Sequence, residues 1–169
     1  AGEIEIIATA GNITQADGST IDGGSDKVTL TAGDSQTLDQ VQTSGADIAI
    51  TAQNGSVTAK DFITTSNGNI GITAAQNVTL FNGESDVTST GSGDVTITAT
   101  AGDLYQENDS TIDGGTGKVT LTAGKKVTLD QVQTTTAAIK ITAQGGDVVA
   151  NDFIKTSDAT IEITGDNDV

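Results

Sequence analysis

The chain has 169 residues and a formal net charge of −16, and aromatic residues make up 2% of it. Nucleic-acid binding needs a basic surface, so this acidic composition excludes DNA and RNA as partners. The chain holds no cysteine and no apolar run long enough for a membrane-inserted helix, so neither a disulfide framework nor membrane insertion is expected.

A repeat of 91 residues organises the whole chain. The hexapeptide STIDGG occupies residues 19–24 and returns at residues 110–115, and the register then holds without a gap over residues 92–169. We therefore predict one continuous repeat domain over residues 1–169, with a first super-repeat over residues 1–91 and a partial second one after it. Because the chain starts in mid-pattern without a methionine, we expect it to be a segment of a longer protein.

A shorter motif, aliphatic–x–aliphatic–Thr–Ala, recurs every 20–25 residues inside the long repeat. Its copies start at Ile4, Val28, Ile48, Ile70, Val95, Val119, Ile139 and Ile161. Alternation with a period of two indicates strands rather than helices. A lone strand of this length cannot keep its apolar face out of water, but equivalent strands can if each one stacks on the next.

Two further extended stretches lie between successive copies of the motif, usually after Gly, Asn or Asp turns. The second strand starts at Ile13, Thr37, Val57, Val78, Leu104, Val127 and Val148, and the third includes Ile21, Val41, Ile63, Val87, Ile112, Val132 and Ile154. We therefore predict an all-β fold: a right-handed parallel β-helix of about eight coils, with three short strands per coil and four coils per super-repeat. The alternative, a β-sandwich, would need hairpins and antiparallel pairing.

The expected core consists of aliphatic ladders from the first and third motif positions, beside an alanine ladder at a tight corner. Phe62 and Phe153 lie one repeat apart and are expected inside the coils. Gln36 stands where the second unit has Val127, and we interpret this polar break as a locally solvated strand end.

The outward threonines of the motif form a column from Thr31 to Thr164 that resembles the threonine arrays of ice-binding proteins. Such a surface needs two neighbouring threonine columns, whereas the adjacent column contains Glu5, Lys140 and Glu162. The high strand propensity of threonine is the simpler explanation.

Acidic turns supply the candidate metal ligands, namely Asp22, Asp26 and Asp113. Calcium prefers six to eight oxygen ligands, which Asp-rich loops can offer. The spacing matches neither the EF-hand nor the calcium-binding nonapeptide, and Gly117 replaces Asp26 in the second unit. A solvated turn and a calcium site both stay open, and no cofactor is required.

Catalysis has little support because the chain contains no His, Cys or Arg, which removes most nucleophilic and general-base arrangements. The remaining candidates are acids that occur once per unit, as structural duplication predicts: Asp39 with Asp130, and Asp61 with Asp152. The glycine-rich stretch 114–118 is similar to a phosphate-binding loop, but no helix is expected after it. We expect no enzymatic activity.

The segments VTLTAG at residues 119–124 and VTLD at residues 127–130 resemble filamentous-haemagglutinin-type repeats of large bacterial surface adhesins. The resemblance covers essentially the whole chain. It implies a right-handed parallel β-helix, an extracellular, secreted or cell-surface location, and a role as a shaft in attachment or matrix formation. It also implies end-to-end contacts with neighbouring solenoid repeats or subunits, and host, cell-surface or matrix glycans or proteins as ligands. No binding residue is transferred.

A carbohydrate-binding or carbohydrate-degrading β-helix module is the alternative function. It would need an aromatic platform or an acidic cleft. Tyr105 and the three phenylalanines supply little toward such a platform.

Overall fold

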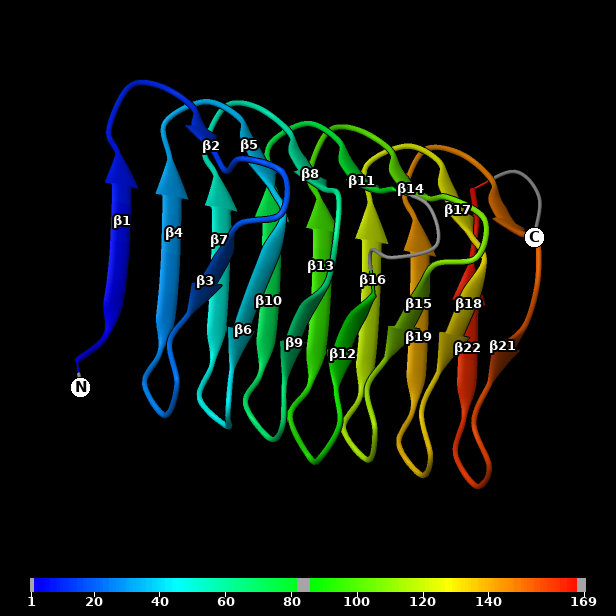
Figure 1. Cartoon of the computed structure of the whole chain (residues 1–169). Helices are drawn as coiled ribbons and strands as arrows, with labels where there is room; N and C mark the ends of the chain where they lie inside the picture. The colour runs from blue at the N-terminus through cyan, green and yellow to red at the C-terminus, as the bar shows by residue number, and fades with distance from the viewer. Residues whose placement is uncertain (1, 82–85, 167–169) are drawn as a thin grey trace.

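The repeated aliphatic motif forms one continuous parallel sheet. The computed structural model describes residues 2–81 and 86–166. The strands of this first sheet follow one another along the axis in chain order (Figure 1): β1 (Ile4–Ala8), β4 (Val28–Ala32), β7 (Ile48–Ala52), β10 (Ile70–Ala74), β13 (Val95–Ala99), β16 (Val119–Ala123), β19 (Ile139–Ala143) and β22 (Ile161–Thr164).

Two seven-stranded sheets close the other sides of each coil. The second sheet contains β2 (Ile13–Thr14), β5 (Gln36–Leu38), β8 (Val57–Ala59), β11 (Val78–Leu80), β14 (Leu104–Gln106), β17 (Val127–Leu129) and β20 (Val148–Ala150). The third contains β3 (Thr20–Asp22), β6 (Gln40–Thr43), β9 (Ile63–Thr65), β12 (Val87–Ser89), β15 (Thr111–Asp113), β18 (Gln131–Gln133) and β21 (Ile154–Lys155).

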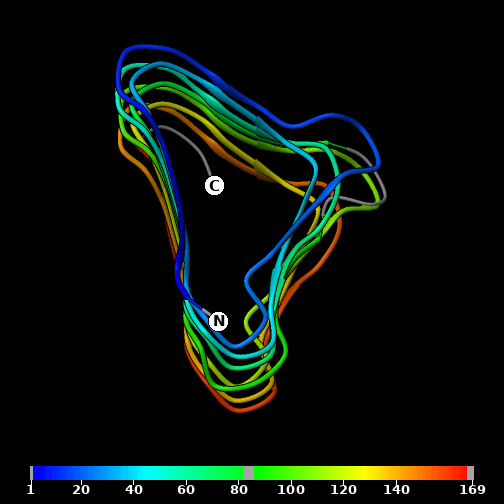
Figure 2. The same cartoon turned by 60° about the vertical axis from the view of Figure 1, so that its left-hand side comes forward.

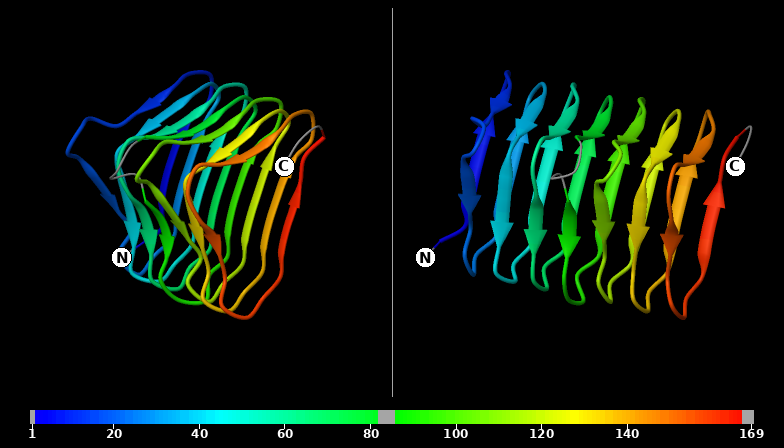
Figure 3. Two further views of the ribbon diagram at one scale, coloured as in Figure 1. Left: turned by 90° about the vertical axis from the view of Figure 1, so that its right-hand side faces the viewer. Right: turned by 45° about the vertical axis from the view of Figure 1, so that its right-hand side comes forward.

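The coils superimpose as closed three-sided outlines when the molecule is viewed close to its axis (Figure 2), and the two ends of the chain lie at opposite ends of the rod (Figure 3). Every strand pair formed by the described residues is parallel and joins one coil to the next. The predicted parallel β-solenoid is therefore confirmed, and the sandwich is wrong. The described strands make seven three-stranded turns, and β22 begins an eighth.

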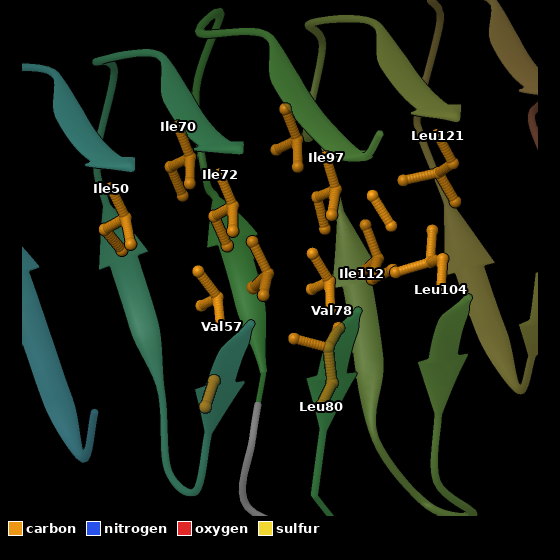
Figure 4. Packing of buried hydrophobic residues seen from close by; sticks show 14 of the residues in the cluster. Ile50, Val57, Ile70, Ile72, Val78, Leu80, Ile97, Leu104, Ile112 and Leu121 are labelled. Atoms are coloured by element: carbon orange, nitrogen blue, oxygen red, sulfur yellow. The ribbon is translucent and has the colours of Figure 1, made fainter. Parts of the chain in front are cut away.

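The predicted ladders fill the interior in the predicted register. Ile48 pairs with Ile70 and Ile50 pairs with Ile72, and each is at most 1% exposed. Facing side chains from the three sheets meet across the coil, as Figure 4 shows for Ile97, Leu104 and Ile112. Burial of each such aliphatic side chain stabilises the fold by about 1.5–3 kcal/mol before the loss of chain entropy is subtracted.

Two predictions about the core are wrong. Gln36 is not at a solvated strand end: it is fully buried, and its Nε2 donates to the carbonyl oxygens of Leu30 and Thr51 at 3.0 and 2.7 Å. Phe62 and Phe153 are only half-buried. The inward position belongs to the residue that follows each of them, because strand side chains alternate between the two faces.

Candidate functional site

The candidate metal ligand Asp22 is a turn-forming residue. Its Oδ1 accepts a hydrogen bond from the amide of Gly24 at 2.8 Å, and its Oδ2 accepts one from Gln42 Nε2 at 2.8 Å. The hydrogen bond from the Gly24 amide, and to a smaller extent the one from the Gln42 side chain, lower the pKa of Asp22 below its ordinary value. Gly24 has a φ of 56°, a left-handed conformation that glycine adopts without a steric penalty.

Asp113 repeats this turn in the second unit. Its two carboxylate oxygens accept from the amide of Gly115 at 2.7 Å and from Gln133 Nε2 at 2.6 Å. Gly115 has the same φ of 56° as its counterpart one super-repeat earlier. The super-repeat is thus visible in side-chain contacts as well as in the backbone.

The three candidate ligands do not converge on one site. Asp22 lies on β3 and Asp113 on β15, four layers away in the third sheet, a separation of about 19 Å at the usual strand spacing. The Oδ2 atom of Asp26 is buried without a hydrogen-bond partner, although the residue as a whole is only half-buried. Among the residues that the structure describes, no group of three acidic side chains is arranged to hold a metal ion. Calcium binding stays a prediction.

Asp39 belongs to a network of hydrogen bonds around the side chain of Gln15, at the corner between the second and third sheets; we call this network the corner lock. Gln15 Nε2 donates to the carbonyl oxygens of Ser19 and Gln40 at 2.6 and 2.9 Å, and its Oε1 accepts from the backbone amide of Asp39 at 3.1 Å. The carboxylate of Asp39 in turn accepts from the amide of Gly18 at 2.7 Å. These contacts hold the loop at residues 16–19 against the next coil.

The same corner lock recurs in the second unit around Gln106. Its Nε2 donates to the carbonyls of Ser110 and Gln131 at 2.7 and 3.0 Å, and its Oε1 accepts from the amide of Asp130 at 3.2 Å. The carboxylate of Asp130 accepts from the amide of Asp109 at 2.8 Å. Figure 2 shows loops projecting at this corner of the coil.

Asp39 and Asp130 therefore have a structural role, and each is 5% exposed. The sequence reading missed Gln15 and Gln106, which are the residues that organise the corner. A usable signal exists, because both glutamines stand where neighbouring coils have the aliphatic residues Leu38 and Leu129, and a polar side chain at an inward position needs partners.

Asp61 and Asp152, the other two equivalent acids, have different surroundings in the structure. Asp61 accepts from the amide of Phe62 and from Gln40 Nε2, both at 2.7 Å. Asp152, its counterpart, is exposed. The partner of the Asp61 carboxylate is thus a neutral amide rather than a second carboxylate.

The glycine-rich stretch 114–118 is a tight turn that leads into strand β16. The amide of Gly117 donates to the carbonyl of Gly114 at 2.7 Å. A Cβ on Gly114 would lie 2.8 Å from the Gly117 carbonyl oxygen and 2.9 Å from a methyl group of Val119. Close packing accounts for the glycine at position 114, and the strand that follows provides no helix N-terminus for a phosphate.

Side chains in the turns form hydrogen-bonded ladders along the rod, a feature that the sequence reading treated only as generic turn composition. Before the second sheet, a side-chain oxygen in each turn accepts a hydrogen bond from the backbone amide of the equivalent residue in the next coil, at 2.8–3.2 Å. The acceptors are Asn12, Ser35, Ser56, Asn77 and Asp103, and the backbone amide of Lys126 is the last donor. Before the first sheet, the side-chain oxygens of Asp47, Asn69 and Asp94 accept in the same way at 2.7–2.9 Å, and the backbone amide of Lys118 is the last donor.

The outward threonine column does not have a second threonine column beside it. The adjacent column contains an ion pair between Lys140 and Glu162 at 3.0 Å, and Ala49 pairs with Thr29 in it. This mixed column favours the strand-propensity explanation over an ice-binding surface.

A hollow on the outer face of the second sheet is lined by Tyr105. It has a volume of about 360 Å³ and is also lined by Asn77, Thr79, Asp103, Leu104, Lys126 and Thr128. Tyr105 is 42% exposed. From the sequence, Tyr105 and the three phenylalanines supplied little toward an aromatic platform, since two of the phenylalanines were expected inside the coils.

Comparison of the chain with protein-family models, with curated proteins and with solved structures gives no significant match. Within residues 2–81 and 86–166, the chain forms no helix that is long and apolar enough to cross a membrane.

Proposed function

We propose that this chain is a shaft segment of an extracellular bacterial surface protein or fibre, serving in attachment or matrix formation. The observation that carries the proposal is the unbroken register of the first sheet, in which eight equivalent strands stack from β1 to β22 without a bulge or an inserted element. The similarity of the repeats to those of filamentous haemagglutinin supports the same role.

The contacts of the rod suit a long spacer. Each coil makes its sheet hydrogen bonds with the coils before and after it, so the same interface can be extended by further repeats. The turn ladders and the aliphatic ladders both run along the axis, where they join one layer to the next. The net charge of −16 favours solubility and opposes lateral association of such rods.

The location is tested by antibody labelling of the source cells. An antibody raised against this folded chain should label intact cells before permeabilisation, and proteases added from outside should remove the signal. Cells that lack the coding segment are the control. Labelling that appears only after permeabilisation would refute the surface location.

The shaft role is tested by shortening the parent protein. Deletion of one 91-residue unit preserves the coil register, so electron microscopy should show a fibre shorter by about 19 Å per unit removed. An unchanged length, or loss of the fibre despite normal export, would contradict a spacer role.

A further inference from the structure

Tyr105 interrupts the threonine column on the outer face of the second sheet, where Val149 of β20 is the other residue that is not threonine. The register places it between Thr79 of β11 and Thr128 of β17, and the equivalent residue one super-repeat earlier is Thr14. A threonine serves at the equivalent position, so stacking of the coils does not require the phenol ring. The ring occurs at one of the two equivalent positions, whereas the turns at Asp22 and Asp113 and the polar corners at Gln15 and Gln106 occur in both units.

The polar residues beside the ring are held in place by the turn ladder. Asn77 Oδ1 accepts the amide of Asp103 at 2.8 Å, and Asp103 Oδ1 accepts the amide of Lys126 at 3.0 Å. In the part of the chain that the structure describes, Asn77 Nδ2, Asp103 Oδ2 and Lys126 Nζ make no hydrogen bond or ion pair. Because all three residues line the hollow, two donor groups and one acceptor are available beside the ring.

We propose that the Tyr105 hollow binds a neutral saccharide. A pyranose offers an apolar C–H face that can lie against an exposed aromatic ring, and hydroxyl groups that need both donors and acceptors around it. The hollow supplies both at fixed positions, and aromatic rings with a polar edge are frequent binding anchors. The net charge of −16 disfavours an anionic glycan.

The lining residues come from three successive coils, because β11, β14 and β17 are neighbours in the second sheet. A glycan chain that lies along the axis crosses one layer about every 4.8 Å, which is comparable with the length of one sugar unit. The site thus fits a short stretch of oligosaccharide better than a free monosaccharide. It does not depend on the shaft role, since a rod of any function could present it.

Tyrosine fluorescence gives a direct test, because Tyr105 is the one tyrosine of the chain and there is no tryptophan. Cellohexaose, mannohexaose and N-acetylchitohexaose serve as neutral probes, and hexagalacturonate serves as the anionic comparison. We expect a saturable change in the Tyr105 emission with at least one neutral hexasaccharide and none with hexagalacturonate.

Substitutions of the lining residues test whether the saccharide binds in this hollow, and titration calorimetry measures the affinity of each variant. Tyr105→Thr restores the threonine column, so its melting temperature should stay unchanged while its affinity falls about tenfold or more. Tyr105→Phe keeps the ring face and should bind within about threefold of the unmodified chain. Lys126→Ser introduces the residue of the first unit, Ser35, and should also weaken binding.

Three outcomes would overturn the proposal. These are the lack of a saturable response to every neutral hexasaccharide, undiminished binding by a folded Tyr105→Thr variant, and a preference for hexagalacturonate. None of them bears on the surface location or on the spacer role, which the labelling and deletion experiments test separately.

Discussion

At the scale of single residues, buried polar side chains distinguish one coil from another. Gln15 and Gln106 have partners for both their amide nitrogen and their amide oxygen, and they lock the corner loops. Gln36 is different, because its Nε2 donates two hydrogen bonds while its Oε1 is buried without a partner. An unpaired buried carbonyl is destabilising.

Replacement of Gln36 by valine, the residue at position 127 of the second unit, should therefore raise the free energy of unfolding by about 1 kcal/mol. The reciprocal change, Val127→Gln, should lower the free energy of unfolding by about 1–3 kcal/mol, because it places a polar amide at the apolar buried position of Val127. Urea denaturation of both variants measures the two changes. A clear loss of stability in Gln36→Val would show that the bonds to Leu30 and Thr51 outweigh the unpaired oxygen.

Because the pKa of Asp22 is lowered in the folded chain, we expect the stability of the fold to depend on pH. The Gly24 amide and the Gln42 side chain hold its pKa below the ordinary value of 3.8. A carboxyl group with a lowered pKa stabilises the fold above the pKa of the unfolded chain, and this contribution is lost as the pH falls through the folded-state pKa. The melting-temperature advantage of the unmodified chain over Asp22→Asn should thus be complete above pH 3.8 and disappear in stronger acid.

The control for this measurement is Asp34→Asn, which changes the same charge at an exposed position. This variant removes one carboxylate but leaves the hydrogen bonds of Asp22 intact, so it separates the loss of a charge from the loss of these bonds. An advantage of Asp22 that persists unchanged through the acid range would contradict the assigned hydrogen bonds.

At the scale of the elements, the sequence predicts the strands well because stacking repeats the same requirement in every coil. The first strand of every coil was located from its alternation, and each residue pair of β7 with β10 has the predicted register. Corners repeat less regularly, since loops of different length meet there. This is why the sequence reading placed Phe62 inside the coil and missed the corner lock.

The candidate site was less predictable than the strands. The turn chemistry of Asp22 and Asp113 depends on glutamine partners one coil away, and the hollow at Tyr105 depends on residues from three coils. Contacts of this kind depend on how the turns of successive coils are aligned with one another. The periodicity of the strands alone does not predict this alignment.

The strand register predicts a sharp contrast between two neighbouring positions on β7. Ile50 is 1% exposed and lies in the aliphatic ladder, so Ile50→Asp should lower the free energy of unfolding by about 4 kcal/mol or more. Ala49 faces outward on the same strand, and Ala49→Asp should change stability by less than about 1 kcal/mol. Thermal melting of the two variants is the measurement, and equal effects would contradict the register.

At the scale of the whole molecule, the 91-residue repeat is an axial period of four layers. β4 and β16 hold equivalent sequences, and three strands of the first sheet lie between them (Figure 1). The repeat therefore extends a rod and does not create a second domain beside the first. The shaft proposal rests on this geometry, since only a constant rise per coil allows repeats to set the length of a fibre.

The most direct test of this account is a set of electron–electron distances between spin labels along the outward threonine column. The chain has no cysteine, so labels attach only where cysteine is introduced: at Thr31 together with Thr122, Thr142 or Thr164. These pairs are four, five and six layers apart, and we predict distances of about 19, 24 and 29 Å, before a common contribution from the labels. Distances that fail to grow by about 5 Å per layer would contradict the axial repeat.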